Sequence, residues 1–365
     1  MENNLFLHCI NKIPNIGPQK ISMLLSYFET ALDIWNCDNY STFITAGLNE
    51  KNAKAFIAHK NKINPEREQK ILNKYKITVL SPTHKKYPQT IKKTLKHPPI
   101  LYTRGNLDIL KNPSITIVGS RKISNYGQQV SNRITKDLSS YQINIVSGLA
   151  LGIDSETHKS LISLYPTNAS AIAVLGGGID DKTIAPRTNF NLAMKILDSS
   201  GLIMSSFTPF TKPSRGTFPA RNTLMAAISK VTIIIEANKN SGSLVTAELA
   251  HKFNKKIFAV PGSIFSENSL GTNSLIKTQK ADIFLDSEEI LNYLKLKNQA
   301  KKSINLTNEI QKIIYEILLK NPEGLNADKI IIYSKKPSSK INSSLTLMEI
   351  NGTIKKLDSG LYTIS

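Results

Sequence analysis

Hydrophobic and polar positions follow three different patterns along the chain. Up to about residue 75, short amphipathic stretches alternate with polar breaks. The segment NKIPNIGPQKISMLLSYF predicts a helix, a tight turn at Gly17 and a second helix. In that second helix Ile21, Leu24, Leu25 and Phe28 form one apolar stripe. The first segment is therefore expected to be helical.

From Ile115 to about Asp286, apolar runs are separated by amphipathic stretches. The runs are ITIVG, INIVSG, AIAVLGGG, GLIMSSF, VTIIIEA, KIFAVPG and DIFL. Continuous β-branched strands with helices between them are typical of a parallel sheet covered on both faces. The predicted fold class is α/β, with a Rossmann-like, doubly wound and mostly parallel sheet.

The last segment has a third pattern. Residues 287–303 are polar and basic, which suits a last helix and a linker. The stretches LTNEIQKIIYEILLK, NADKIIIYS and SSKINSSLTLMEI then predict three helices. The end, GTIKKLDSGLYTIS, predicts a β-hairpin turning at Asp358, Ser359 and Gly360. Three helices followed by a hairpin is the plan of a winged helix.

These patterns divide the chain into five parts. We expect a small helical domain at 1–75 that is similar to SAM and helix-hairpin-helix domains. A connector follows at 76–114, where prolines argue against a long regular element and a short strand is expected at Ile100 to Tyr102. The Rossmann-like domain covers 115–296, a linker covers 297–305, and the winged helix covers 306–365.

The helical hairpin around Gly17 has two interpretations. A glycine turn before a helix N-terminus can hold a DNA backbone phosphate on free amides. The alternative, which we favour because only one such hairpin is visible, is a helical bundle whose turn needs glycine.

The charge of the chain favours a polyanionic partner. Its 365 residues carry a formal net charge of +20. A genome biased toward A and T would also inflate lysine, so arginine is the better indicator. Arginine binds phosphate in a bidentate fork. Most arginines fall in one central stretch: Arg121, Arg133, Arg187, Arg215 and Arg221.

Several classes of protein are not supported. Cys9 and Cys37 form no CxxC pair, so we expect neither a disulfide scaffold nor a cysteine zinc site. No signal peptide and no apolar run of about 20 residues is visible, so a cytoplasmic protein without a membrane partner is expected.

Small residues follow the ends of most predicted central strands. They lie at Gly119-Ser120-Arg121, Ser147-Gly148, Gly176 to Gly178, Ser205-Ser206, Ser241-Gly242-Ser243 with Thr246 beyond, and Pro261-Gly262-Ser263. Small residues at one edge of a sheet let an anion approach backbone amides and helix N-termini. Packing alone explains one such loop, whereas several on one edge favour an extended anionic ligand.

A dinucleotide cofactor does not fit these loops. GSRKIS is not GxGxxG, GGGIDD lacks the third glycine, and no acidic residue ends the second strand of the domain. GxxxxGK[ST] is also absent, which argues against a P-loop. We therefore expect no cofactor.

The loop TKPSRGTFPARN combines cations with an aromatic residue. It holds Lys212, Arg215, Phe218 and Arg221, and it ends at Asn222. Such a mixture suits single-stranded nucleic acid, because cations bind phosphates and the ring stacks on a base. The equally plausible alternative is that Phe218 completes the core while the cations are solvated.

Candidates for catalysis are few. Asp154 and His158 would share a helix face, but we expect Asp154 to cap the helix and His158 to pack nearby. No third ligand is visible at metal spacing, so no metal site is expected. Glu248 follows a Gly-Ser loop and is the one acid that could act in glycosidic cleavage.

Together these motifs resemble the DprA/Smf family, the DNA-processing proteins of bacterial transformation. IVGSRKISNYG, VSGLALGID with His158, IAVLGGGID, FPARN, SGSLVTAELA and FAVPGSI with GTNSLI match its central motifs in order. The connector also matches, whereas the two terminal segments match more loosely. Six motifs in order are highly specific.

The resemblance implies a non-enzymatic protein that binds single-stranded DNA and loads the RecA recombinase onto it. It also implies a homodimer through the Rossmann-like domain, with single-strand-binding protein as a further candidate partner. The family's phosphate-binding arginine falls on Arg121, and its basic aromatic loop falls on Lys212, Arg215, Phe218, Arg221 and Asn222. The full predicted DNA site adds Gly119, Ser120, Ser147, Gly148, Arg187, Gly242, Ser243 and Thr246.

The chain departs from the family pattern in three loops. Ala185 stands where the family usually has tyrosine, SSFTPF lacks a common acidic residue, and the segment near GLNADKI lacks the usual acidic dipeptide.

Two other functions stay open. One is a nucleotide phosphoribohydrolase-like enzyme using Glu248, although PGGxGTxxE is absent. The other makes the C-terminal domain a duplex-binding or protein-docking module.

Overall fold

The computed structural model describes residues 2–296, 308–321, 323–350, 353–357 and 360–364. Contacts divide the chain into two compact units, Met1–Lys297 and Asn298–Ser365, and each is described by itself. The predicted linker at 297–305 lies outside the described residues. Within the described ranges, no helix is long and apolar enough to cross a membrane.

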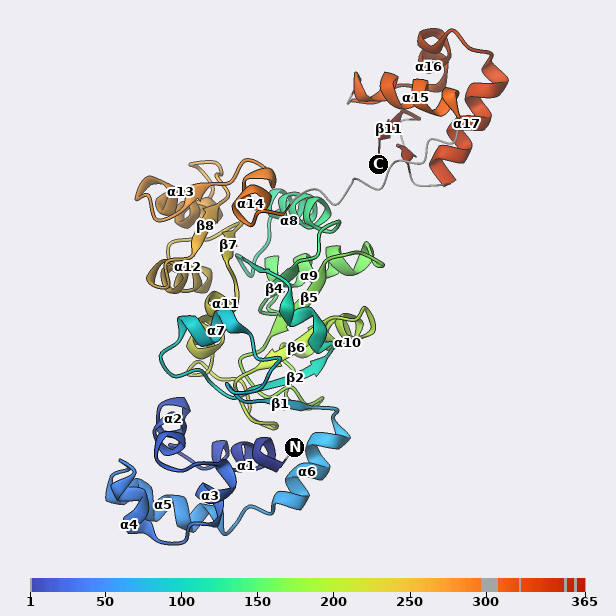
Figure 1. The fold of residues 1–365 in the computed structure, drawn as a ribbon. Coiled ribbons are helices and arrows are strands. Elements are labelled where there is room, and N and C mark those ends of the chain that lie inside the picture. Colours follow the sequence, from blue (N-terminus) through green and yellow to red (C-terminus); the bar gives the residue numbers. More distant parts are fainter. Residues whose placement is uncertain (1, 297–307, 322, 351–352, 358–359, 365) are drawn as a thin grey trace. The chain divides into compact units, whose positions relative to one another are not determined.

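Six helices form the first part of unit one (Figure 1). They are α1 (Glu2–Asn11), α2 (Pro18–Tyr27), α3 (Ala31–Asn36), α4 (Tyr40–Thr45), α5 (Glu50–Lys60) and α6 (Pro65–Lys74). The predicted hairpin is confirmed, with Gly17 as the N-cap of α2 and Ile21 and Leu24 buried. Asparagine side chains cap α4, α5 and α6 by accepting backbone N–H groups.

The helical part is tied to the sheet by a buried polar cluster. His8 is fully buried between the Tyr102 hydroxyl at 3.1 Å and Glu68 Oε2 at 3.0 Å. Burial alone would raise the pKa of Glu68, but hydrogen bonds from His8 and Lys12 lower it to about 2. Tyr102 lies in β2 (Leu101–Gly105), so the cluster joins helices α1 and α6 to the sheet.

One nine-stranded sheet forms the centre of unit one. The other strands are β1 (Thr78–Leu80), β3 (Ser114–Val118), β4 (Asn144–Ser147), β5 (Ser170–Val174), β6 (Leu202–Ser205), β7 (Val231–Ile234), β8 (Lys256–Ala259) and β9 (Asp282–Ile283). Their order is β1-β2-β6-β5-β4-β3-β7-β8-β9. Strands β3 to β9 are parallel, whereas β2 is antiparallel to both β6 and β1. The predicted mostly parallel sheet is confirmed.

The connector contributes more structure than its prolines suggested. The strand expected near Ile100 is present as β2, and β1 was not predicted at all. Both extend the sheet beyond β6, so residues 76–114 belong to the same layer as the central strands.

Helices cover both faces of the sheet. They are α7 (Gln89–Thr94), η1 (Leu107–Lys111), α8 (Asn125–Leu138), α9 (Ile153–Ser163), η2 (Arg187–Asn189), α10 (Phe190–Asp198), α11 (Phe218–Ile228), α12 (Gly242–Lys252), η3 (Glu267–Ser269), α13 (Leu270–Lys277) and α14 (Glu288–Tyr293). Alternate strand residues enter two different cores: Ile115, Ile117 and Ile145 face one, and Val118 and Val146 face the other. Double-sided burial explains why the strands are almost wholly apolar.

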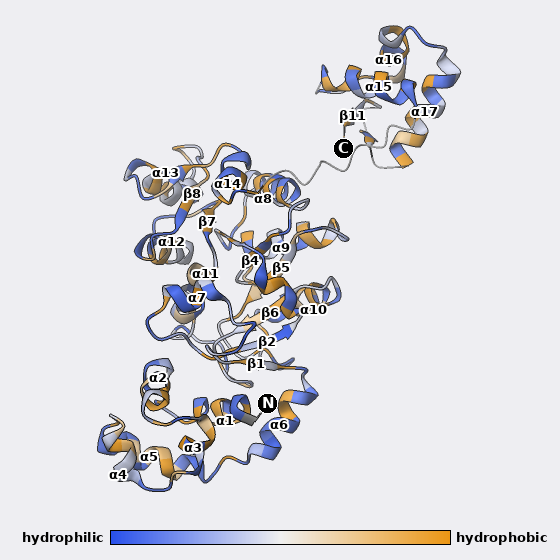
Figure 2. Ribbon diagram, in the orientation of Figure 1, coloured by the Kyte–Doolittle hydropathy of each residue, from blue (hydrophilic) through white to orange (hydrophobic). Residues whose placement is uncertain are grey.

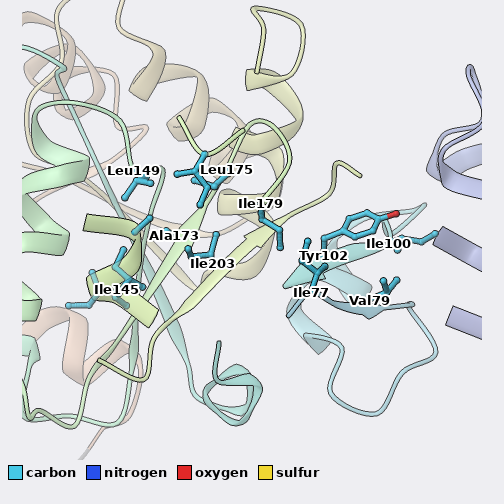
Figure 3. Packing of buried hydrophobic residues seen from close by; sticks show 14 of the residues in the cluster. Ile77, Val79, Ile100, Tyr102, Ile145, Leu149, Ala173, Leu175, Ile179 and Ile203 are labelled. Carbon is cyan, nitrogen blue, oxygen red and sulfur yellow. The ribbon is translucent and has the colours of Figure 1, made fainter. Parts of the chain in front are cut away.

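The first core continues without a break from the helical part into the sheet. Figure 3 shows Ile77, Val79, Ile100 and Tyr102 on one side of it, and Ile203 with its neighbours on the other. In Figure 2 many helices carry both hydrophobic and hydrophilic residues, as expected for helices that cover a core.

The topology places a crevice at one edge of the sheet. After β3 the chain builds β4, β5 and β6 on one side, and then returns to β7 on the other side of β3. Where the winding direction reverses in this way, the loops after the two strands part. The crevice therefore lies outside the carboxyl ends of β3 and β7.

The described residues of unit two form three helices and two strands. They are α15 (Glu309–Leu319), α16 (Ala327–Ser334), α17 (Ser338–Ile350), β10 (Ile354–Lys356) and β11 (Tyr362–Ile364), with β10 and β11 antiparallel. Their core includes Ile314, Ile330 and Leu345. The elements occur in the predicted order. Residues 358 and 359 of the predicted turn lie outside the described residues, and the winged-helix assignment stays a prediction.

Candidate nucleic-acid interface

The turn after β3 presents an arginine to solvent. Hydrogen bonds within the turn hold its shape: Ser120 Oγ donates to the Lys122 carbonyl at 2.9 Å and accepts the Lys122 amide at 3.1 Å. Gly119 is required because a Cβ there would come within 2.6 Å of Ile153. Asn268 braces the turn by donating to the Lys122 carbonyl. Arg121 projects from this turn with its side chain exposed.

Phe218 lies between two arginines. The guanidinium carbons of Arg121 and Arg221 are each 5.6 Å from the centroid of its ring. Phe218 begins α11 and Arg221 follows three positions later, so both project from the same face of that helix. The distances are those of cation–π contacts. The three side chains form a connected basic and aromatic cluster, which we call the arginine–phenylalanine stack.

Arg221 is held by a buried carboxylate. Its Nη1 lies 3.6 Å from Asp154 Oδ2, and only 7% of Arg221 and 5% of Asp154 is exposed. Asp154 also accepts the amides of Gly148 and Ala150 at 3.2 and 3.4 Å. Burial raises the pKa of Asp154 and lowers the pKa of Arg221, and their mutual attraction offsets each shift only in part.

Two glycines make room for the stack. A Cβ on Gly148 would come within 1.3 Å of Arg221 Nη1. A Cβ on Gly176 would come within 3.1 Å of the Phe218 ring. These two glycines therefore leave space for the Arg221 and Phe218 side chains, in addition to any space that they leave for a ligand.

Two hollows meet at the stack. The larger, about 560 Å³, lies between the ends of β3 and β7; its lining includes Gly119, Ser120, Lys122, Asn222, Gly242, Ser243, Thr246 and Asn268. The smaller, about 230 Å³, lies beside Gly148, Gly176, Gly177 and Pro213. Arg121, Phe218 and Arg221 line both. A ligand that follows this edge of the sheet would cross the stack.

The comparisons with known proteins identify the family. The model of the family described as DNA recombination-mediator protein A matches residues 78–295. The chain belongs to this family. The matched range begins at β1, so it includes the connector strands as well as the central domain.

Relatives of this family member are found among curated proteins and solved structures. Protein Smf of Synechocystis is 31% identical over 285 residues, which cover 77% of this chain and 70% of the relative. Protein Smf of Escherichia coli is 37% identical, and this chain spans about half of its length, 54%. The DNA processing protein A of Streptococcus pneumoniae has a TM-score of 0.66 at 28% identity, covering 79% of this chain and 97% of that one.

The structure brings most of the predicted DNA site together. The hollows collect Gly119, Ser120, Arg121, Gly148, Phe218, Arg221, Asn222, Gly242, Ser243 and Thr246. These residues come from the turns after β3 and β4 and from α11 and α12.

Four predicted site residues lie outside both hollows. Ser147 is fully buried, and its hydroxyl donates to the Ile117 carbonyl between two strands, so it has no ligand role. Arg187 donates to the Asp181 carbonyl and covers the Phe190 ring at 4.1 Å. Lys212 and Arg215 are exposed on the loop before α11, where neither lines a hollow.

The expected helix cap at Asp154 is wrong. The N-cap of α9 is Gly152, without a side-chain cap, and Asp154 is instead the counter-ion of Arg221. His158 is packed as expected: it is fully buried, and burial lowers its pKa to about 4. Asn268 was not predicted from the sequence, because it reaches the Arg121 turn from η3, nearly 150 residues away.

Glu248 lies away from both hollows. It is exposed on α12, while Ser243 and Thr246 of the same helix face the larger hollow. Cys9 and Cys37 are free. Among the residues that the structure describes, no group of three or more His, Cys, Asp or Glu side chains could hold a metal ion.

Proposed function

We propose that this protein binds single-stranded DNA along the carboxyl edge of its sheet and presents the strand to a RecA recombinase. The observation that carries the proposal is the arginine–phenylalanine stack. It offers an exposed guanidinium for a phosphate beside an aromatic ring for a base, at the point where two hollows meet.

The geometry favours an unpaired strand over a duplex. An aromatic ring can stack only on a base that is free of its complement, whereas duplex bases are already stacked on one another. The smaller hollow beside Phe218, about 230 Å³, suits one flat group. The DNA processing protein A of Helicobacter pylori, a relative at 30% identity and a TM-score of 0.53 that covers 60% of this chain, has been solved for its mode of binding single-stranded DNA.

The proposed activity is binding without bond breakage. Glycosidic cleavage by Glu248 is less well supported, because its carboxylate lies away from the hollows in which a nucleotide would bind. Release of free base from nucleoside monophosphates, abolished by Glu248→Gln, would establish the enzyme instead.

The direct test of the proposal is a titration with labelled strands. We expect single-stranded DNA to bind more tightly than duplex DNA of equal length at two salt concentrations. Arg121→Ala removes the exposed guanidinium, so affinity should fall at least tenfold, since a hydrogen bond to a charged group contributes about 1.5–3 kcal/mol. The salt slope should also fall by about 0.7, which is the loss of one phosphate contact on a single strand.

The matched control is Arg133→Ala. Arg133 is an exposed arginine on α8 that lines neither hollow, so its loss changes net charge equally without touching the site. If both variants weaken binding alike, or if neither does, the assignment of the stack is overturned.

The partners are tested separately. We propose that a homodimer formed through the Rossmann-like domain acts in the cytoplasm with RecA and with single-strand-binding protein. The protein should stimulate RecA ATP hydrolysis on strands coated with single-strand-binding protein, and Arg121→Ala should lose that stimulation. A protein that binds strands normally but never stimulates RecA would refute the mediator role and leave strand binding intact. Light scattering would establish the oligomer.

A further inference from the structure

A further hollow lies at the amino edge of the same sheet, opposite the two hollows described above. It has a volume of about 450 Å³ and is lined by residues that precede β3 and β7, together with the loop before α7. Its charged residues are Lys85, Lys86, Lys111, Lys230 and Asp108, so it carries a formal net charge of +3. We call it the lysine groove.

The lysine groove is more basic than the hollow that we assign to single-stranded DNA. The larger hollow at the carboxyl edge has Arg121, Lys122 and Arg221 against Asp154 and Glu267, a formal net charge of +1. In the lysine groove, Asp108 pairs with Lys86 at 2.8 Å. Within the described ranges, neither Lys85 nor Lys230 has a carboxylate within ion-pair distance.

The fold of the sheet brings two of these lysines, Lys111 and Lys230, to one edge together with Lys255, which lies outside the groove. Lys111 comes three residues before β3, Lys230 immediately before β7, and Lys255 immediately before Lys256, the first residue of β8. These strands are successive neighbours, so their starting points lie roughly 5 Å apart along one edge. The Lys230 amide donates to the Ser114 carbonyl at 2.9 Å, which fixes this alignment.

Lys230 also has a cationic neighbour outside the groove, Lys255. Burial lowers the pKa of Lys255, and the positive charge of Lys230 adds to that shift. Like charges held close together are unfavourable unless an anion relieves them. The uncharged polar residues of the groove, Gln89, Thr90 and Asn112, could donate hydrogen bonds to such an anion.

We propose that the lysine groove binds the phosphate backbone of a second segment of nucleic acid, at the opposite edge of the sheet from the arginine–phenylalanine stack. Lysines without arginine or an aromatic partner recognise phosphate as point charges, so this contact is independent of sequence and sensitive to salt. The two edges are separated by at least the length of a strand, roughly 16 Å for five residues, so they hold separate segments.

Helix ends provide the competing explanation. Lys230 follows the end of α11, and Lys255 follows the end of α12, where cations favourably oppose the helix dipole. Lysines with that role alone would stabilise the fold and would make no contact with DNA.

The deciding experiment is lysine footprinting of the full chain with and without a 60-nucleotide oligo-dT. Acetylation of each lysine is measured by mass spectrometry. We expect the acetylation rates of Lys85, Lys111 and Lys230 to fall at least threefold on addition of DNA. Exposed lysines on α6, α10 and α13, namely Lys70, Lys195 and Lys277, serve as internal controls and should keep their rates. Equal rates in the groove and in the controls would overturn the proposal.

Variants separate the lysine groove from the stack. Lys85→Gln/Lys111→Gln/Lys230→Gln should reduce the salt slope for the 60-nucleotide strand by about 2, since each single-strand phosphate contact contributes about 0.7. The control is Lys70→Gln/Lys195→Gln/Lys277→Gln. A groove variant with a lower melting temperature and an unchanged slope would refute DNA binding by the groove and leave Lys230 with the helix-end role alone.

Two further outcomes are decisive. Footprint protection that persists in Arg121→Ala would show that the lysine groove binds DNA without the stack, so the two proposals can fail independently. Protection by poly-glutamate but not by oligo-dT would overturn nucleic acid as the occupant.

Discussion

Replacing Asp154 with asparagine tests how Arg221 is held. The carboxylate is 3.6 Å from the guanidinium, and both groups are buried. At an effective dielectric constant of about 20, their attraction over that distance is about 4.6 kcal/mol. Asparagine can still accept the amides of Gly148 and Ala150 but leaves a buried cation unpaired. We expect the free energy of unfolding to fall by about 3 kcal/mol.

The assay is urea unfolding followed by fluorescence of Trp35, the one tryptophan of the chain, which lies in unit one. A saturating oligo-dT should raise the free energy of unfolding more in Asp154→Asn than in the unchanged protein, because a phosphate replaces the lost anion. The control is Glu50→Gln, which breaks an exposed pair with Lys54 away from both proposed sites and should leave stability unchanged. An Asp154→Asn protein of full stability would refute the reasoning, as would equal stabilisation by DNA.

Two other predictions concern the same region. Gly148→Ala should weaken binding of single-stranded DNA about tenfold and destabilise the fold by about 1–3 kcal/mol, because its Cβ would displace the Arg221 guanidinium. Gly17→Ala is its control, since no atom lies within 4 Å of the added Cβ; equal effects in both would contradict this account. For His158, burial lowers the folded-state pKa from 6.5 to about 4. The contribution of neutral His158 to the free energy of unfolding is therefore fully present above pH 6.5. It falls by about 3 kcal/mol as the pH decreases toward 4. In His158→Leu, the free energy of unfolding measured with urea should decrease between pH 7 and pH 4 by about 3 kcal/mol less than in the unchanged protein. A pH profile equal to that of the unchanged protein would exclude His158 as the cause.

The central sheet could be predicted because its strands are buried on both faces. Runs such as ITIVG and VTIIIEA have no polar face, and this pattern is hard to form in any other element. Strand β1 was missed for the opposite reason. It has three residues, and it pairs only because β2 lies antiparallel beside it, a contact across more than 20 positions that no local pattern encodes.

The candidate site was predictable where neighbouring residues build it and was not where distant residues do. Phe218 and Arg221 share one turn of α11, so their proximity follows from helical spacing. The partnership of Arg221 with Asp154 joins α11 to α9 and could not be read from either segment. Ser147 was misassigned because a small residue at a strand end can serve either a ligand or the next strand, and only the position of Ile117 decides.

The two basic edges of the sheet differ in how they would hold nucleic acid. At the carboxyl edge, one arginine is neutralised by a buried aspartate and the other is exposed, so little net charge remains. Affinity there must come from the geometry of the stack, and stacking is only weakly screened by salt. At the amino edge, lysines supply the charge, and Tyr87, an aromatic residue of the groove, is too deeply buried to stack on a base. Rising salt should therefore release nucleic acid from the lysine groove before it releases the strand on the stack, which would leave the carboxyl edge as the site that persists.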